Sequence, residues 1–197
     1  LHRLIRRQRQ MCIRDRAILV TDRAFGNADT LATSYSIVSA ANTAGKFDLI
    51  FCGKETLDGA TGQMGSQLAE RFDAAQITSA SLIKDIDLEN KKLTVERELE
   101  NGTETLEVTM PCLFTMEKKN YPLRLPSLKN WMASKKAVIT TLTSKDIPGL
   151  DLDRIGDPGS PTKVPRMFPP VMPEPGVMLD EGSAEATVTK LISLIKD

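Results

Sequence analysis

The chain of 197 residues is poor in the side chains that carry most enzymatic chemistry. Its single histidine is His2, and its three cysteines, Cys12, Cys52 and Cys112, form no Cys-x-x-Cys pair. Beyond His2 there is no Ser-His-Asp triad, no Cys-His pair and no histidine-based zinc site. We therefore expect no catalytic residue and no metal site, so that any redox role depends on a bound cofactor. Isolated thiols are typical of a reducing compartment, and we expect a cytoplasmic protein.

The sequence also lacks a long apolar run and a net charge. No apolar stretch approaches the roughly 18–20 residues of a membrane-spanning helix, so we expect no membrane span. Lys+Arg and Asp+Glu number 26 each, and hydrophobic residues make up 41%, which suits a folded domain. Residues 1–16 hold six arginines and one aspartate, which leaves 20 basic and 25 acidic residues elsewhere. An acidic body has no field to attract nucleic acid, and we expect no such partner.

Residues 1–16 differ in character from the rest of the chain. They lack the serine-rich amphipathic pattern of a transit peptide, and no signal-peptide apolar region follows them. A basic nucleic-acid arm is one interpretation, but the segment also resembles adapter-derived sequence at the ends of fragmentary reading frames. We interpret it as a non-native segment. The expected organisation is then an α/β domain over residues 17–150, incomplete at its N-terminus, followed by an arm and helix over residues 151–197.

Two short apolar runs, each followed by a helical pattern, open the body of the chain. Residues 17–21 (AILVT) and 47–52 (FDLIFC) have the composition of buried parallel strands. A helix capped by Asp29 or Thr30 is predicted to reach residue 44, and a second helix is predicted over residues 63–72. This order is typical of a parallel sheet flanked by helices, so we predict an α/β fold with a parallel Rossmann-like sheet.

The hydrophobic period changes after residue 77. Two alternating segments, residues 92–99 and 103–110, flank Asn101-Gly102, a pair that favours a tight hairpin turn because both residues tolerate positive φ. We expect this β-hairpin as an addition to the parallel sheet. Three further elements are predicted, namely a strand at 112–115, a helix at 127–136 and a strand at 137–142.

Proline marks the C-terminal part of the chain. Seven of the 11 prolines fall between Pro158 and Pro175, which predicts an extended segment. The same stretch contains Phe168 and Met172 among its apolar residues, and an amphipathic helix is predicted over residues 183–196. This pattern favours an arm that embraces a partner subunit. The alternative is an arm that wraps its own domain.

The segment FCGKETLDGATGQMG, residues 51–65, follows a predicted strand and opens a predicted helix. Its glycines at 53, 59, 62 and 65 let backbone amides approach a ligand, and a helix N-terminus attracts phosphate. The segment matches neither GxGxxG nor GxxxxGK[ST], which excludes those two phosphate-binding motifs. The alternative is a loop that is glycine-rich for steric reasons alone. The candidate cofactor-binding residues of this segment are Gly53, Lys54, Asp58, Gly59, Ala60, Thr61, Gly62, Gln63 and Met64.

A second helix start, residues 27–34, brings hydroxyl side chains to the same predicted edge of the sheet. Thr30 and Thr33 are its candidate cofactor-binding residues, and ordinary helix capping is the alternative. Residues Tyr121–Pro126 (YPLRLP) form a stiff, partly apolar loop, which we interpret either as a plain connection or as a protein-docking loop.

Together these motifs resemble the beta subunit of electron transfer flavoprotein, from about residue 17 to the end. The similar segments are DRAFGNADTLATSYS, FDLIFCGKETLDGATGQMGSQLAE, VERELENGTETLEVTMPCLFT, PSLKNWM and IGDPGSPTKVPRMFPP. The opening strand–helix units of that family are absent here, and the docking loop carries one extra residue. Four positions depart from the residues usual in the family, namely Glu55, Ala60, Asn101 and Phe114.

The resemblance implies an adenine nucleotide alpha hydrolase-like fold and an electron-carrier subunit without a catalytic residue of its own. It implies a heterodimer with the alpha subunit, which shares an FAD with beta. The beta site then holds AMP, or a second FAD in members that bifurcate electrons, and the ADTLATS segment resembles the bifurcating type. Acyl-CoA or other dehydrogenases are expected to dock on the Tyr121–Pro126 loop. The alternatives are a nucleotide-sensing module of the universal-stress type and a nucleotide-hydrolysing or adenylating enzyme.

Overall fold

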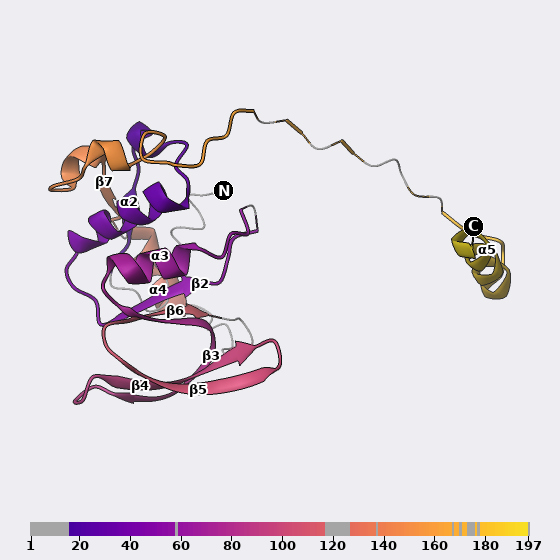
Figure 1. The fold of residues 1–197 in the computed structure, drawn as a ribbon, viewed down its shortest axis with the longest axis horizontal. Coiled ribbons are helices and arrows are strands. Elements are labelled where there is room, and N and C mark those ends of the chain that lie inside the picture. The colour runs from indigo at the N-terminus through magenta and orange to yellow at the C-terminus, as the bar shows by residue number, and fades with distance from the viewer. Residues whose placement is uncertain are drawn as a thin grey trace. The chain divides into compact units, whose positions relative to one another are not determined.

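The computed structural model describes residues 16–57, 59–116, 127–136, 138–166, 168–169, 171–172, 176 and 178–196 (Figure 1). It divides the chain into two compact units, Leu1–Lys163 and Val164–Asp197. The first unit thus runs past residue 150 and takes in the start of the segment that we grouped with the arm. The predicted non-native segment up to residue 15, Asp58 and the Tyr121–Pro126 loop lie outside the described residues.

Two sheets form the first unit. β1 (Ile18–Val20) pairs in parallel with β7 (Thr140–Leu142). The second sheet has the order β2-β6-β3-β4-β5. Its strands are β2 (Leu49–Gly53), β3 (Ala75–Asp87), β4 (Lys92–Leu99), β5 (Gly102–Thr109) and β6 (Cys112–Met116). β2, β6 and β3 run parallel, whereas β3, β4 and β5 run antiparallel. The predicted parallel α/β fold with a hairpin addition is confirmed, and the separation into two sheets is new.

Helices lie where the apolar periodicity predicted them. The α-helices of this unit are α2 (Thr30–Asn42), α3 (Met64–Arg71) and α4 (Leu128–Lys136), and short 3-10 turns are η1 (Arg23–Phe25), η2 (Ser144–Asp146) and η3 (Leu152–Arg154). α2 ends two residues before its predicted end, because Thr43 already serves as its C-cap. Figure 1 shows α2 and α3 stacked beside β2 and β6.

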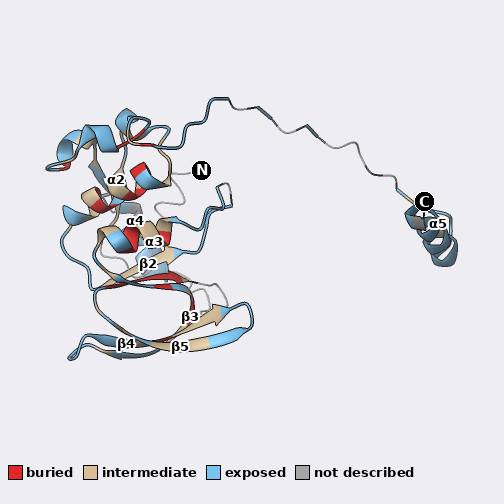
Figure 2. Cartoon of the chain, viewed as in Figure 1, coloured by how far each residue is buried: buried red, intermediate tan, exposed pale blue. Residues whose placement is uncertain are grey.

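The buried core lies on both faces of β6, whose residues are nearly all buried (Figure 2). Leu113 packs with Val38 of α2 and Leu68 of α3. Its neighbours Cys112 and Phe114 pack on the opposite face with residues of β3 and β4. This alternation is the two-residue period of a strand, and it makes β6 the central strand between the helices and the hairpin.

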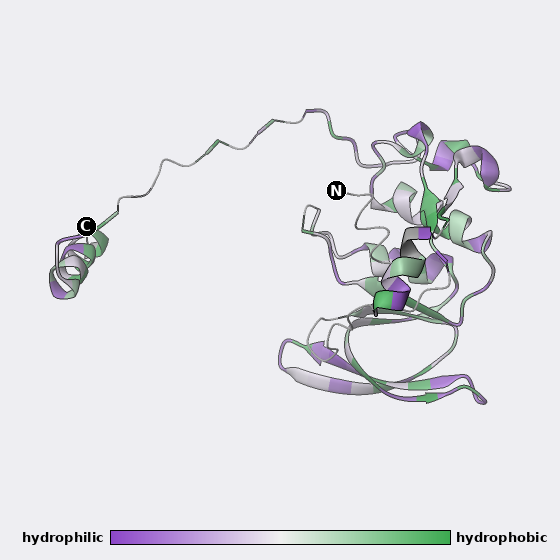
Figure 3. Ribbon diagram, turned by 180° about the vertical axis from the view of Figure 1, so that it is seen from behind, coloured by the Kyte–Doolittle hydropathy of each residue, from purple (hydrophilic) through white to green (hydrophobic). Residues whose placement is uncertain are grey.

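The hairpin itself follows from its sequence. Strands β4 and β5 pair without a register shift from Lys92 opposite Thr109 to Leu99 opposite Gly102. Hydrophobic and hydrophilic colours alternate along these strands in Figure 3. The cross-strand ion pair Lys92–Glu107, at 2.6 Å, lies on the polar face, whereas Arg97–Glu104, at 2.7 Å, continues the face that carries Val95 and Leu106. Exposed ion pairs contribute little stability, so the apolar face fixes the register of the hairpin.

The second unit contains α5 (Ala184–Lys196), as predicted. Its N-terminus is capped by Ser183 Oγ, which accepts a hydrogen bond from the amide of Ala186 at 3.3 Å. Apolar residues of this helix, including Val188 and Ile192, are about half exposed. Within the described residues, no helix is both long and apolar enough to cross a membrane.

Candidate functional site

The glycine-rich loop begins where β2 ends at Gly53 and leads into α3 at Met64. Thr56 shapes the first turn, since its carbonyl accepts from the amide of Ala60 at 2.9 Å and its Oγ1 from the amide of Gly59 at 3.3 Å. Ala60 and Gly62 both have positive φ, at 44° and 61°. The described residues of this loop are exposed, so its backbone is open to a ligand.

Among the described residues, no side chain is seen to cap the N-terminus of α3. Its N-cap residue, Gln63, has helical dihedral angles and makes no capping hydrogen bond with its side chain. The first-turn amides of a helix have no partner within the helix, and together with the helix dipole they attract anions. An uncapped helix start after an exposed glycine-rich loop is therefore suited to a phosphate group.

The N-terminus of α2 is built in the opposite way. The carboxylate of Asp29 accepts from the amide of Ala32 at 3.0 Å and from the amide of Thr162 at 3.1 Å. Burial alone would raise the pKa of Asp29, but these amide donors outweigh it and lower the pKa below its ordinary value. A charged carboxylate at this position repels an anion. The amide of Ala32 is thus already occupied, and side-chain hydroxyl groups are what this helix start offers a ligand.

Asp29 also fastens a distant part of the chain to α2. Its amide donates to Ser160 Oγ at 2.9 Å, and this buried hydroxyl donates to the carbonyl of Gly156 at 2.6 Å. With the Thr162 contact, the loop that ends the first unit is held at the start of α2. In the sequence this loop is visible as the Gly-Ser-Pro-Thr run, but nothing in that run predicted its contact with Asp29.

The two segments predicted to bind a nucleotide are in direct contact. Thr30 Oγ1 donates to Gln63 Oε1 at 3.0 Å and accepts from Gln67 Nε2 at 3.2 Å. The Oε1 atom of Gln67 is buried and accepts no hydrogen bond within the described part of the chain. Gln67 was not predicted, although its position four residues after Gln63 places both side chains on one face of α3.

The remaining predicted site residues differ in position. Thr33 is half-buried one turn into α2, whereas Thr61 is exposed in the loop.

Burial raises the pKa of Cys52 and raises that of Cys112 to about 11, so both thiols are protonated at neutral pH and are poor nucleophiles. No group of three or more His, Cys, Asp or Glu side chains among the described residues is arranged to hold a metal ion.

Comparison with known proteins gives one consistent result. Residues 12–147 match the sequence profile of the electron transfer flavoprotein domain. Protein FixA of Bradyrhizobium diazoefficiens is 36% identical over 186 residues, which are 92% of this chain and 64% of FixA. Caffeyl-CoA reductase-Etf complex subunit CarD of Acetobacterium woodii is 37% identical over 183 residues, 93% of this chain and 68% of CarD.

A third relative carries the family name itself. Electron transfer flavoprotein subunit beta of Thermoanaerobacterium thermosaccharolyticum is 41% identical over 151 residues, which are 76% of this chain and 56% of that protein. The chain therefore spans 56% to 68% of the length of these three relatives.

Proposed function

Since the chain belongs to the electron transfer flavoprotein family, we propose that it is a beta-type subunit that binds an adenine nucleotide and works within an electron-carrying heterodimer. The uncapped N-terminus of α3, at the end of an exposed glycine-rich loop, is the observation that supports the nucleotide site. The first-turn amides and the positive-φ turn at Ala60 and Gly62 suit a phosphate group.

FAD is the nucleotide we propose, and AMP is its competitor. The Thr30–Gln63 hydrogen bond brings the ADTLATS segment, which resembles the bifurcating type, against the start of α3, and this supports FAD over AMP. Asp58, outside the described residues, is the proposed acceptor for the ribose or adenine, and Thr61 and Gln63 are proposed hydrogen-bond donors to the nucleotide. A bound flavin would supply the electron transfer, while the chain binds the nucleotide and orients it. Electron bifurcation is the finer proposal that follows from FAD.

The proposed partner is the alpha subunit, bound through the second unit. Phe168, Val171 and Met172 of the arm are 73%, 94% and 81% exposed. One side of α5 adds further exposed apolar side chains, including Leu191 and Ile192. Apolar side chains in a proline-rich segment have little chance of burial within that segment, so a partner protein suits them. Docking of dehydrogenases at residues 121–126, outside the described residues, and a cytoplasmic location both stay predictions.

The nucleotide site is tested by a matched pair of glycine variants. Gly62 and Gly149 have similar positive φ, at +61° and +69°, and no atom within 4 Å of an added Cβ, so a valine strains both backbones similarly. Each variant is co-expressed with the alpha subunit, and bound FAD and AMP are measured by chromatography after denaturation. We expect Gly62→Val to lose the beta-site nucleotide and Gly149→Val to keep it. Equal nucleotide content in both would contradict the proposal.

Truncation tests the partner. A cut after Lys163 removes the second unit and keeps Ser160 and Thr162 on Asp29, so the α/β body should keep its circular dichroism spectrum. We expect the truncated chain to lose co-purification with the alpha subunit. A normal flavin-loaded heterodimer from the truncated chain would refute the arm's role. A colourless homodimer of the full chain would instead favour the nucleotide-sensing alternative.

A further inference from the structure

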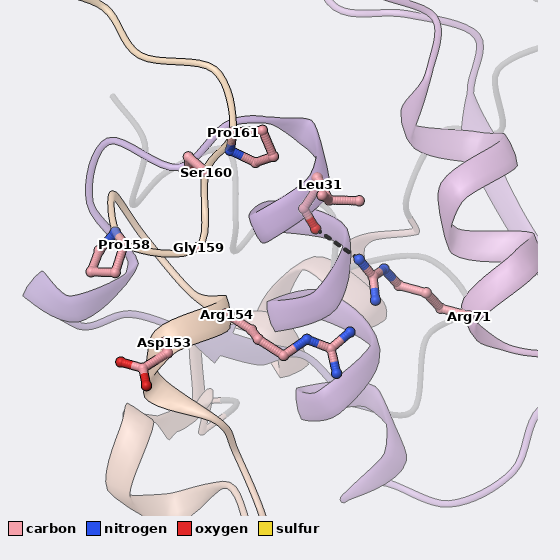
Figure 4. Close-up of a pocket in the computed structure, with 8 residues that line it drawn as sticks. All are labelled: Leu31, Arg71, Asp153, Arg154, Pro158, Gly159, Ser160 and Pro161. Atoms are coloured by element: carbon pink, nitrogen blue, oxygen red, sulfur yellow. Dashed lines mark hydrogen bonds between the residues drawn. The ribbon is translucent and has the colours of Figure 1, made fainter.

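A polar hollow lies on the first unit, lined by residues outside the glycine-rich loop. It has a volume of about 400 Å³, which is within the range of small-molecule sites. Eight residues line it, namely Leu31, Arg71, Asp153, Arg154, Pro158, Gly159, Ser160 and Pro161 (Figure 4). None of them is a candidate cofactor-binding residue, so this hollow is a different site.

Two guanidinium groups of the hollow share one aromatic ring. The Cζ atoms of Arg154 and Arg71 lie 4.2 Å and 5.5 Å from the ring centroid of Tyr35. The hydroxyl of Tyr35 accepts from the amide of Asp151 at 3.1 Å, which fastens the ring to the segment that carries Arg154. Stacking on a fixed ring orders both cations before any ligand arrives.

The two arginines differ in what else they bind. Arg71 Nε donates to Ser34 Oγ at 2.9 Å, and its Nη2 donates to the carbonyl of Leu31 at 3.1 Å. The guanidinium of Arg154 makes no hydrogen bond and no ion pair with any residue that the structure describes. Its five N–H groups, and those that Arg71 leaves unused, are available to an acceptor in the hollow.

The charge of the hollow is positive. Figure 4 shows both arginine side chains directed toward the same space beside α2, while the carboxylate of Asp153 points away from them. Two like charges held near one ring repel each other, and an anion between them removes that repulsion. Leu31, Pro158 and Pro161 add apolar wall, and Leu31 is 42% exposed.

We propose that this hollow, the Arg71–Arg154 site, binds the phosphate group of a small organic phosphate. The planar guanidinium groups suit paired oxygen acceptors, and two cations match a dianionic phosphate better than a single carboxylate. The apolar wall takes the organic part of the ligand. A hollow of this volume has room for more than inorganic phosphate.

Phenyl phosphate is the probe, because it joins a phosphate to an apolar ring. Binding to the full chain is measured by calorimetry, with inorganic phosphate, benzoate and phenol as comparison probes. We expect phenyl phosphate to bind most tightly and phenol not to bind. Arg154→Gln should weaken phenyl phosphate by about tenfold or more, because a charge-assisted hydrogen-bond donor is lost. Arg154→Lys keeps the charge without the planar fork, and should recover only part of the affinity.

Two controls separate this site from general electrostatics and from the proposed nucleotide site. Arg23→Gln removes the same charge from an exposed position on η1 and should change affinity less than about twofold. Gly62→Val should leave the Arg154-dependent binding unchanged, whatever it does to FAD or AMP. Equal losses in Arg154→Gln and Arg23→Gln, or the absence of saturable binding, would overturn the proposal. Tighter binding of a short acidic peptide than of phenyl phosphate would also overturn it, in favour of a protein ligand.

Discussion

Replacing Gly65 with alanine tests how α3, which presents the candidate phosphate site, is held on the sheet. An added Cβ at residue 65 would lie 2.3 Å from Thr115 Cγ2, too close for two carbon atoms. Thr115 is 4% exposed on β6, and its Oγ1 accepts from the amide of Ser79 at 2.9 Å. Rotating the methyl group away would therefore break that hydrogen bond.

The expected magnitude follows from three contributions. Either α3 moves off β6 by about 1 Å, an overpacking cost of about 1–3 kcal/mol, or the Ser79 amide loses its acceptor at a similar cost. Alanine gains up to about 1 kcal/mol over glycine in a helix. The net loss of unfolding free energy is then about 1–2 kcal/mol, or roughly 2–8 °C in Tm.

A double-mutant cycle isolates the contact. Thr115→Ser removes Cγ2 and keeps the hydroxyl, so Gly65→Ala should be neutral or stabilising in that background. Urea denaturation followed by circular dichroism measures all four chains, and we expect a coupling energy of about 1–3 kcal/mol. Gly53→Ala is the control, because no atom lies within 4 Å of its added Cβ. An equal cost of Gly65→Ala in both backgrounds would show that the methyl contact does not hold α3 in place.

Three further predictions can be tested independently. The carboxylate of Asp22 accepts from Ser144 Oγ at 2.6 Å, and this bond with the Ser144 and Ala24 amides lowers the pKa of Asp22 from 3.8 to about 2. Its contribution to stability is therefore full above about pH 4 and is lost toward pH 2, and Asp22→Asn should flatten that part of the urea-unfolding profile. Burial raises the pKa of Cys112 to about 11, so iodoacetamide at pH 8 should label it slowly in the folded chain and readily in urea. Gly156→Ala should cost about 3 kcal/mol or more, because φ is +55° and the added Cβ would lie 2.1 Å from the carbonyl oxygen of Ala24; a smaller loss in Tm than for Gly65→Ala would contradict this.

Local pattern was enough to predict most elements of the fold. Apolar runs and helical periodicity predicted β1, α2, β2 and α3 to within about two residues, because these signals depend on neighbouring residues only. Asn101-Gly102 likewise predicted the β4–β5 hairpin, since a tight turn fixes the pairing of the strands beside it. The order of these elements also predicted the fold class, and the family resemblance added the electron-carrier role and the partner subunit.

The four glycines of residues 51–65 show what local sequence pattern could not predict. Gly53, Gly59, Gly62 and Gly65 looked alike in the sequence, and all four were expected to let amides approach a ligand. The structure separates them: Gly62 has positive φ in the loop, whereas Gly65 is small because α3 packs against Thr115. The structure thus gives Gly65 a packing role that was not predicted, since a packing contact across 50 residues leaves no trace in the residues beside it.

What the sequence by itself determined was the type and order of the helices and strands, because backbone propensity and hydrophobic period act over a few residues. What only the tertiary structure decided was which distant residues meet. Ser160 and Thr162 reach back to Asp29, and Arg154 joins Arg71 on the ring of Tyr35. Such contacts arise when the chain buries its apolar faces together, and burial is a property of the whole fold rather than of any one segment.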